Sequence, residues 1–572
     1  MIVTLTSFGN GHNAAHDVDV DVVVAGGGPI GLMLACELRL GGASVLVLER
    51  LTEIDQTVKA GSLTVPAVEA LYRRGLFPQL IEEQQRMREQ FQAFARQRQA
   101  ALTPQAPSTP QAPLVPTPPQ PPEPSPSTPQ ASAPPPPSRF AGHFAGLFID
   151  AALVDGTDPD FADRGPAASG AMITQQAVEA ILGRHAAELG VEVRRGVEVT
   201  GFEADDEGVT VPAAGDRIRA GWLVGCDGGR SLVRRQAGFD FPGTGPEITG
   251  HQAVVEMTGT EALRPGWNRT ESGVYVFGPA PGRILTVEFD GPPEDRDTPV
   301  TAAELQASLR HVSGVDVTIT GVHSATRYTD NARQATTYRL GRVLLAGDAA
   351  HVHSPFGGQG LNLGLGDAMN LGWKLAAVAR GRAPERLLDS YTAERHPIGA
   401  WVLDWSRAQV ALMRPEPGAR ALDGVVRDLM GTVAGTTYFV KRISGLWQRY
   451  DLGQGHELAG RSAPDLSLAD GTRLAGHLHD GRGLLLDLAG DPELRALAQE
   501  WADRVHLIAD GCPGAPELST LLVRPDGCVA WAADKGASLD GLQAALTTWF
   551  GPPGAALRPP GAEPSGVSSA SR

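Results

Sequence analysis

Hydrophobic residues in this chain gather in short runs that are separated by turn residues and by longer periodic stretches. Residues 18–25 form a valine-rich run, residues 32–40 carry the apolar pattern of a helix, and residues 43–48 form a second apolar run. Short β-branched runs are typical of strands that are buried on both faces of a parallel sheet. We therefore predict a strand, a helix and a second parallel strand at the start of the chain.

Two later segments repeat the order of strand, turn and helix. Residues 222–225 are an apolar run that breaks at an Asp-Gly turn, and a helix is expected to begin near Leu232. Residues 342–346 form another apolar run, which precedes a Gly-Asp turn, a glycine-rich loop and a long apolar helix over residues 361–379. Strands that alternate with helices in this way predict an α/β fold built on a parallel sheet.

The segment between residues 241 and 338 has a different pattern. Strand-like stretches such as GVYVFG and RILTVEF predict a second domain with a mixed or antiparallel sheet, which would cover the first domain and determine specificity. Three aromatic residues lie on these stretches: Tyr275, Phe277 and Phe289. Two interpretations of them stay open, the lining of a substrate cavity and ordinary sheet core.

The prolines of the chain are concentrated in one place. Of 45 prolines, 16 lie between Pro104 and Pro137. Proline lacks the amide donor and restricts φ, so this segment cannot form a helix or an inner strand. We predict an insertion without regular structure over residues 102–139, after an exposed helix over residues 81–101. The alternative is a docking segment for a partner with an aromatic groove, and residues 551–572 are expected to form a second unstructured stretch.

Charge and cysteine content exclude several classes of protein. The formal net charge is −16, and no Lys or Arg precedes Arg39. An acidic chain of this kind does not fit nucleic-acid binding or a secretory signal, and no apolar stretch is long enough for a membrane span. The four cysteines (Cys36, Cys226, Cys512 and Cys528) form no CxxC pair. We therefore expect a cytoplasmic protein without disulfides or a cysteine-based zinc site.

The first predicted strand ends in the pattern G-x-G-x-x-G, formed by Gly26, Gly28 and Gly31. In a dinucleotide-binding fold these glycines allow a tight turn, the approach of a pyrophosphate, and packing of the helix on the strand. Glu49 ends the second strand, 18 residues after Gly31, where a carboxylate can bond the hydroxyls of an unphosphorylated ribose. The motif predicts a dinucleotide site but does not choose between FAD and NAD.

Asp227 and Asp348 each follow a predicted strand. A carboxylate at such a strand end can accept hydrogen bonds from sugar hydroxyls, and amides at a helix start stabilise negative charge. For Asp227 an alternative stays open, because its side chain would also suit the cap of the helix that begins near Leu232. His351 and His353 lack the partners of a metal site, so no metal is predicted.

Three motifs in this order give the chain a specific resemblance. They are the G-x-G-x-x-G turn, CDGGRSLVRR over residues 226–235, and GRVLLAGDAAHVHSPFGGQGLNLGLGDAMNLGWKLA over residues 341–376. Together they resemble the group A flavoprotein aromatic hydroxylases, which are FAD monooxygenases of the para-hydroxybenzoate hydroxylase fold. Within this group the chain is most similar to actinobacterial polyketide and antibiotic hydroxylases, including the rifampicin monooxygenase type. The resemblance covers residues 17–550 apart from the proline-rich insertion.

The resemblance implies a set of FAD-binding residues. The glycines of the first motif, Glu49 and Arg50 would hold the ADP part, and Asp348 would bond the ribityl and pyrophosphate region. Pro355 and the amides that begin the long helix would line the isoalloxazine. Where many relatives have Arg, this chain has Lys59, which keeps the charge but loses the planar fork. The full set is Gly26, Gly28, Gly31, Glu49, Arg50, Lys59, Gln175, Asp227, Asp348, Pro355, Gly358, Gly360, Leu361 and Asn362.

The resemblance also implies a division into domains. The fold class is α/β, with a Rossmann-like FAD-binding domain interrupted by a mixed-sheet substrate domain and followed by a thioredoxin-like domain. Without a CxxC pair, that last domain has no thiol-exchange activity, and packing or oligomerisation is its expected role. The expected boundaries are residues 17–80, 140–240 and 339–400 for the FAD domain, 241–338 for the substrate domain, 401–455 for a helical connector and 456–550 for the thioredoxin-like domain.

The reaction that the resemblance implies uses FAD, NAD(P)H (NADPH before NADH) and O2. Reduced flavin would form a C4a-hydroperoxide that hydroxylates a small aromatic substrate, a polyketide or another phenol. Since the flavin supplies the chemistry, no catalytic side chain is assigned. Alternatives stay open: a Baeyer–Villiger oxygenase, an antibiotic-inactivating monooxygenase, and a flavoprotein that only binds an aromatic ligand. Whether the protein is a monomer or a homodimer is also open.

Overall fold

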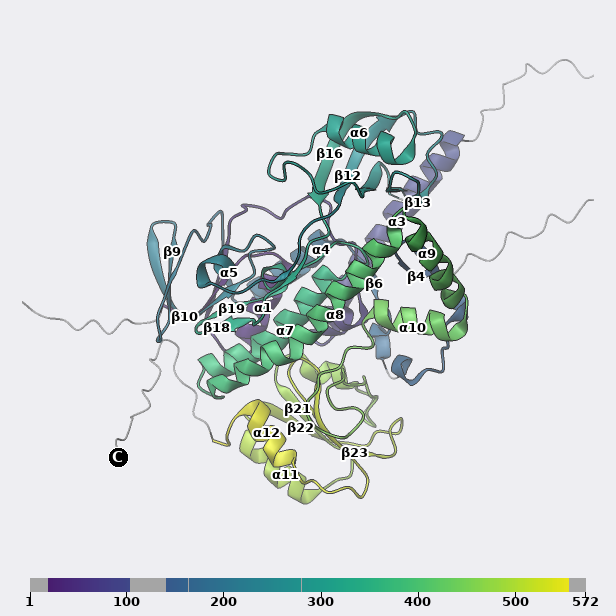
Figure 1. The fold of residues 1–572 in the computed structure, drawn as a ribbon. Coiled ribbons are helices and arrows are strands. Elements are labelled where there is room, and N and C mark those ends of the chain that lie inside the picture. Colours follow the sequence, from purple (N-terminus) through teal and green to yellow (C-terminus); the bar gives the residue numbers. More distant parts are fainter. Residues whose placement is uncertain (1–18, 103–139, 163, 279, 555–572) are drawn as a thin grey trace, which may run out of the picture.

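The computed structural model describes residues 19–102, 140–162, 164–278 and 280–554 (Figure 1). The proline-rich insertion and most of the C-terminal tail therefore lie outside the described residues. No helix in the described part of the chain is long and apolar enough to cross a membrane.

The central sheet is mainly parallel, as predicted. Its strand order is β18-β19-β10-β1-β2-β7, with β9 and β8 added antiparallel beside β10. β18 is also antiparallel to its neighbour. The bounds are β1 Val20–Ala25, β2 Val45–Glu49, β7 Glu192–Arg195, β8 Glu203–Ala204, β9 Val209–Ala213, β10 Asp216–Gly225, β18 Arg339–Leu340 and β19 Val343–Leu345.

Helix α1 (Pro29–Leu40) packs against both α4 (Gln175–Glu188) and α7 (Gly360–Ala379). Its side chains are buried almost throughout, because neighbouring helices cover the surface that the sheet leaves free. In Figure 1, α7 and α8 (Asp389–Met413) run through the middle of the molecule, between the second sheet and the C-terminal part. These two helices therefore connect parts of the molecule that are distant in the sequence.

The second sheet has the order β13-β14-β15-β12-β16 and is antiparallel throughout. Side chains alternate between its faces: Ile284 contacts the core under α6, whereas Leu285 and Val287 contact an aromatic cluster on the other side. The bounds are β12 Thr249–Thr258, β13 Gly266–Arg269, β14 Val274–Phe277, β15 Arg283–Glu288, α6 Ala302–Ser313 and β16 Thr318–Tyr328.

The C-terminal part has a four-stranded sheet in the order β22-β21-β23-β24. β21 and β22 are parallel and joined through α11, and β23 and β24 form an antiparallel hairpin before α12. This topology confirms the thioredoxin-like expectation. The bounds are β21 Gly483–Asp487, α11 Pro492–Ala498, β22 Val505–Ala509, β23 Leu518–Val523, β24 Val529–Asp534 and α12 Leu542–Phe550.

The remaining elements connect these three parts. Helices α9 and α10 follow α8, and the small pair β3 and β6 lies beside the first helices. The bounds are β3 Ser62–Leu63, α2 Val65–Tyr72, α3 Phe77–Leu102, β4 Phe140–Phe144, β5 Leu147–Asp150, β6 Ala171–Met172, α5 Leu232–Ala237, β11 Gly243–Thr244, β17 Ala332–Gln334, β20 His351–Val352, α9 Pro417–Met430 and α10 Val433–Ser444.

Two of the expected domain limits, which stay predictions, lie within continuous structure. Helix α8 begins at Asp389 and continues through residue 401, so no break in the chain lies at the expected start of the connector. At the other limit, residue 551, Gly551 is buried and its carbonyl accepts a hydrogen bond from the indole of Trp501 at 2.8 Å. Ordered structure therefore extends past Phe550.

Candidate FAD site

The site is built where the parallel strands end together. Ala25 at the end of β1 pairs with Leu48 of β2 and with Gly225 of β10, and Gly225 pairs with Leu345 of β19. Because this register is shared, the turns after these strands meet at one edge of the sheet. Motifs that are more than 300 residues apart in the chain thus come together.

The glycine turn after β1 has the conformation that its sequence predicts. Gly26 has φ +109°, and a Cβ atom there would lie 2.3 Å from the carbonyl oxygen of Cys226. A Cβ atom on Gly31 would lie 1.9 Å from the carbonyl oxygen of Gly26. Around Gly28 no described atom lies within 4 Å of the Cβ position, so a ligand can approach this backbone at the start of α1.

Glu49 is fixed beside this turn. One carboxylate oxygen accepts a hydrogen bond from the amide of Gly27 at 2.6 Å, and the other accepts one from the amide of Leu51 at 2.8 Å. Each oxygen keeps a second lone pair for a ribose hydroxyl. Arg50 is exposed at the end of the strand.

Asp227 combines the two interpretations that the sequence left open. Its Oδ2 accepts hydrogen bonds from the amides of Leu232 at 2.7 Å and Val233 at 3.1 Å, so it caps α5. Its Oδ1 is buried and has no hydrogen-bond partner among the described residues. A buried carboxylate oxygen without a partner is costly, so this atom points to a donor that a ligand supplies. The neighbouring Cys226 is half-buried, and burial raises the pKa of its thiol.

The Gly-Asp turn after β19 exposes one carboxylate to the site. Gly347 has φ +63° and is buried, whereas Asp348 is exposed. Burial lowers the pKa of the nearby His353, against the opposing influence of Asp348. His351, the other histidine of the HxH pair, lies with its Nε2 atom 2.7 Å from Asp367 Oδ2. This pairing accounts for His351 without a metal.

The loop before α7 brings backbone groups to the same edge. Pro355 is exposed, Gly358 has φ +61°, and α7 begins at Gly360. The side chain of Asn362 accepts a hydrogen bond from the amide of Thr64 at 2.8 Å and donates one to the carbonyl of Gly358 at 2.8 Å. Leu361 is buried beside Asn362. The side chain of Asn362 thus connects the loop before α7 to the segment before α2.

Lys59 and Gln175 lie at the segment that follows β2. Lys59 Nζ forms an ion pair with Asp55 at 2.8 Å and is partly exposed. Gln175 begins α4, and its amide donates to the carbonyl of Ala60 at 2.9 Å. One turn later, burial raises the pKa of Glu179 although Arg195 lies 3.3 Å away. The structure therefore places Lys59 near these groups, with its charge already paired.

These features test whether FAD fits the chain. The open backbone at Gly28, the fixed carboxylate of Glu49 and the unpartnered Oδ1 of Asp227 lie around the ends of adjacent strands. The starts of α1 and α7 contribute free amides near the same edge. This donor and acceptor set fits a dinucleotide with a pyrophosphate and sugar hydroxyls.

An aromatic cluster covers the loop before α7. The ring of Phe356 lies 5.9 Å from the ring of Tyr328 on β16 and 6.3 Å from that of Trp267 on β13, between ring centroids. Phe144 and Trp405 extend the cluster, with their ring centroids 4.5 Å apart. The cluster packs Phe356 of this loop against side chains of the second sheet.

The structure decides between the two interpretations of the sheet aromatics. Tyr275 and Phe277 face the core under α6, whereas Phe289 packs against the aromatic cluster. Tyr275 and Phe277 are therefore sheet core. Only Phe289 of the three lies on the face toward the loop before α7.

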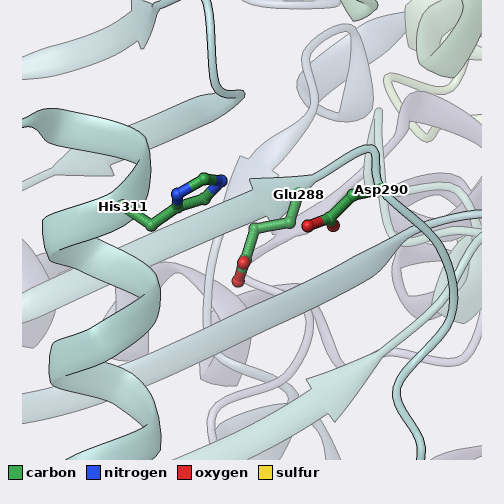
Figure 2. Close-up of side chains that lie close together, drawn as sticks. All are labelled: Glu288, Asp290 and His311. Carbon is green, nitrogen blue, oxygen red and sulfur yellow. The ribbon is translucent and has the colours of Figure 1, made fainter.

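Two cavities lie elsewhere. One of about 90 Å³ lies between the FAD domain and the C-terminal part and is lined by charged groups such as Arg73, Arg395 and Asp526; it is too small for a polycyclic ligand. The other, about 510 Å³, is lined by polar residues on the α6 face of the second sheet. Glu288, Asp290 and His311 are grouped there, with ligand atoms within 4.8 Å of one another. Figure 2 shows His311 reaching over from α6 toward the end of β15, on the sheet face opposite the aromatic cluster.

Sequence reasoning missed residues that support the site from behind. Asp367, Arg395 and Tyr450 are linked by hydrogen bonds below the Gly-Asp turn. A signal was present for Asp367, since a charged residue within an apolar helix such as 361–379 needs a buried partner. The partner itself could not be identified, because Arg395 lies on another helix.

Comparisons with known proteins agree with this geometry. The FAD binding domain family matches residues 19–406, and the C-terminal domain of aromatic-ring hydroxylases matches residues 456–553. Over 557 residues the chain is 40% identical to 12-dehydrotetracycline 5-monooxygenase/anhydrotetracycline 6-monooxygenase of Streptomyces rimosus, covering 93% of this chain and 99% of the relative. It is 38% identical to rifampicin monooxygenase of Streptomyces venezuelae, covering 93% and 98%.

A solved structure extends the likeness to three dimensions. OxyS anhydrotetracycline hydroxylase from Streptomyces rimosus has a TM-score of 0.78 and 38% identity, covering 93% of this chain and 99% of that chain. The resemblance that the three turn motifs indicated is thereby confirmed. The chain belongs to the FAD-dependent aromatic-ring hydroxylases, a family of flavin monooxygenases and therefore of oxidoreductases.

Proposed function

We propose that this protein uses NAD(P)H, with NADPH preferred, and O2 to hydroxylate a polycyclic phenol of the polyketide class. The observation that carries the proposal is the aromatic cluster of Phe356, Tyr328 and Trp267 over the loop before α7. A flat aromatic substrate is recognised by such rings through stacking and edge contacts. The names of the relatives, which act on tetracycline precursors and on rifampicin, support the same substrate class.

The binding roles follow from the contacts at the strand ends. Gly26, Gly28 and Gly31 would give the pyrophosphate access to the start of α1, and Glu49 would bond the ribose. Asp348 would bond the ribityl chain, and the unpartnered Oδ1 of Asp227 would accept a hydrogen bond from FAD or from the nicotinamide. The loop residues Pro355, Gly358, Gly360, Leu361 and Asn362 would contact the isoalloxazine.

Two expected FAD contacts need side-chain movement or act indirectly. Lys59 would have to leave Asp55, its partner at 2.8 Å, in order to contact the cofactor. Gln175 would contact FAD from the start of α4, and Arg50 would lie at the adenosine end. When bound, FAD supplies the electron transfer and oxygen activation.

The protein's own contribution is a dry, oriented site. Phe356 and Phe144 are buried in the aromatic cluster and Trp267 packs against it, so these rings would exclude water over the loop. Burial raises the pKa of Tyr328, so its phenol stays protonated and donates to the carbonyl of Thr286 at 3.2 Å. Burial lowers the pKa of His143 to about 4, so this imidazole is neutral at pH 7. Neutral side chains around the substrate favour an uncharged aromatic ligand.

The test begins with purification and an absorbance spectrum. A yellow protein that oxidises NADPH faster in the presence of anhydrotetracycline-like or other polycyclic phenols supports the proposal. With 18O2, a product that carries one labelled phenolic oxygen supports hydroxylation, whereas a ring-inserted lactone assigns the Baeyer–Villiger alternative. If the panel yields no oxygenated product and NADPH oxidation is unchanged, the protein is a flavoprotein that only binds its ligand.

A further inference from the structure

A fully buried carboxylate lies directly behind the Gly-Asp turn. Asp367 on α7 is 0% exposed, and its Oδ2 accepts a hydrogen bond from the amide of Gly347 at 3.1 Å. The same oxygen lies 2.7 Å from Nε2 of His351. Asp367 therefore holds both ends of a five-residue segment that has the exposed Asp348 at its second position.

Other contacts hold the middle of this segment: Arg234 donates to the carbonyl of Ala349 at 2.9 Å, and the amide of Ala335 donates to the carbonyl of Ala350 at 2.8 Å. Gly347 has φ +63°, and a Cβ atom there would lie 3.2 Å from the side chain of Ile30 on α1. On α7, a Cβ atom on Gly364 would lie 2.7 Å from the same Ile30. The turn is thus pressed between two helices, and its first amide points inward to Asp367 and away from the cofactor side.

Positive charge balances the buried carboxylate. Arg395 on α8 donates from Nε to Asp367 Oδ1 at 2.8 Å and from a terminal nitrogen to the carbonyl of Leu363 at 2.9 Å. Burial alone would raise the pKa of Asp367, but His351 and Arg395 outweigh it and keep the pKa below its ordinary value. The carboxylate is therefore ionised and accepts hydrogen bonds only.

The same arginine connects the turn to the C-terminal part. Its other terminal nitrogen donates to the phenol oxygen of Tyr450 at 3.1 Å. The ring of Tyr450 in turn has the guanidinium carbon of Arg524 5.4 Å from its centroid. Arg524 follows β23 directly, so a continuous set of contacts runs from the thioredoxin-like sheet to the turn that presents Asp348.

We propose that Asp367 is a positioning residue for FAD. Asp367 holds the Gly347–His351 segment in the geometry that presents Asp348 to the cofactor, and Arg395 and Tyr450 connect this segment to the C-terminal domain. The C-terminal domain then has a role in flavin binding without contacting the flavin. This inference depends on FAD binding and is independent of the substrate and of the reaction.

The test compares two buried carboxylates in the holoenzyme. Asp367→Asn replaces an acceptor of three donors by an amide, whereas the control Asp487→Asn makes the same change at a buried carboxylate of β21 that lies outside these contacts and accepts from the amides of Gly490 and Asp491 and from Arg495. We expect both variants to melt at lower temperature. Only Asp367→Asn should release FAD on dilution with a dissociation constant raised by about tenfold or more, as expected for lost charged hydrogen bonds.

A second readout separates positioning from general loosening. The absorption maxima and reduction potential of the flavin that stays bound should shift in Asp367→Asn and stay at wild-type values in Asp487→Asn. Asp367→Glu, which keeps the charge with a longer side chain, should recover part of the affinity. Equal FAD affinity in Asp367→Asn and Asp487→Asn, with unshifted spectra in both, would overturn the proposal.

A milder variant keeps the test decisive if Asp367→Asn fails to fold. Tyr450→Phe removes one phenol oxygen at the far end of the contacts and leaves the ring against Arg524. We expect a measurable rise in the FAD dissociation constant, smaller than that in Asp367→Asn. Wild-type FAD affinity and potential in Tyr450→Phe would contradict the link to the C-terminal domain.

Discussion

Single residues at the FAD site are constrained in different ways, even where they are of the same type and belong to the same sequence motif. Gly31 has no room for a side chain, because the helix packs on the strand at that position. Gly28 has free space around it, so its constraint comes from the ligand that approaches it. Asp227 is shared between a helix cap and an oxygen left without a partner. Contacts of the protein with itself and contacts with the cofactor can therefore be separated by substitution.

Substitution of the two glycines by alanine should give different results. In Gly31→Ala the new Cβ would lie 1.9 Å from the carbonyl oxygen of Gly26, so we expect a loss of stability of about 1–3 kcal/mol or more. Gly28→Ala should leave the unfolding of the apoprotein nearly unchanged but weaken FAD binding by about tenfold, equal to about 1.4 kcal/mol. Chemical denaturation and FAD titration measure the two effects.

A third glycine provides the control for this comparison. Gly424 lies within α9 with no described atom within 4 Å of its Cβ position. Gly424→Ala should stabilise the protein by up to about 1 kcal/mol through helix propensity and leave FAD binding unchanged. A similar loss of FAD affinity in Gly424→Ala would show that the loss in Gly28→Ala is not specific to the FAD site.

At the scale of elements, the two faces of the second sheet have separate tasks. One face packs on α6 and the other on the aromatic cluster, because side chains alternate along each strand. Phe277 on β14 and Phe289 directly after β15 are both half-buried but lie on opposite faces. This gives a matched pair of the same residue type for testing which face meets the substrate.

Phe289→Ala should raise KM for the aromatic substrate by about tenfold, with a smaller change in kcat, because it removes a ring from the face toward the loop before α7. Phe277→Ala should lower stability by about 2 kcal/mol and leave KM unchanged. Steady-state kinetics with the substrate found in the panel, together with thermal denaturation, measure both. If the two variants raise KM equally, the aromatic cluster is not the substrate site.

The proline-rich insertion joins α3, which ends at Leu102, to β4, which begins at Phe140. We expect a variant in which residues 103–139 are replaced by a short Gly/Ser linker to bind FAD with wild-type stoichiometry and affinity, because the family motifs lie outside this segment. Flavin absorbance per protein and a melting curve check the prediction. Loss of FAD would mean that the insertion contributes to the FAD domain.

At the scale of the whole molecule, buried charges join the FAD domain to the C-terminal part. Glu394 accepts hydrogen bonds from Arg524 at 2.8 Å and from Lys374 at 3.0 Å. Arg74 pairs with Glu37 at 2.6 Å and also donates to the carbonyl of Leu478 at 2.8 Å. Removing one member of such a buried pair is costly, because the partner charge is left uncompensated. The C-terminal part is therefore held firmly against α7 and α8.

Glu394 makes this interface sensitive to acid. Burial would raise its pKa, but Arg524 and Lys374 outweigh burial and lower the pKa to about 2, from the ordinary 4.5. Its contribution to stability is therefore complete above about pH 4.5 and is lost as the pH falls toward about 2. Glu394→Gln should be less stable at pH 7 and should show a shallower loss of stability over that range, measured by urea unfolding at a series of pH values. An unchanged pH dependence would contradict this role.

The sequence by itself determined the parts that depend on local order. Strand, glycine turn and helix are contiguous at Gly26–Gly31, and the residues after β10 and β19 belong to the same kind of unit, so fold class, family and FAD could be predicted from them. The predicted FAD contacts of individual side chains and the domain boundaries stay predictions. The structure nevertheless places Gly26, Glu49, Asp227 and Asp348 at or just after the ends of adjacent strands.

Only the tertiary structure decided the contacts between segments that are distant in the chain. The sequence pattern could not assign Phe277 and Phe289 to one face of the sheet or the other. Side chains alternate between the faces along a strand, so an error of one residue in the predicted position of the strand reverses the face of every side chain on it. Nor could the sequence pattern pair Asp367 with Arg395, or Glu394 with Arg524, since a buried charge indicates that a partner exists without identifying it. Local backbone preferences and motif spacing depend on residues that are close together in the sequence. The side chains that hold the turns of the FAD site come together only through the packing of α7, α8 and the C-terminal part.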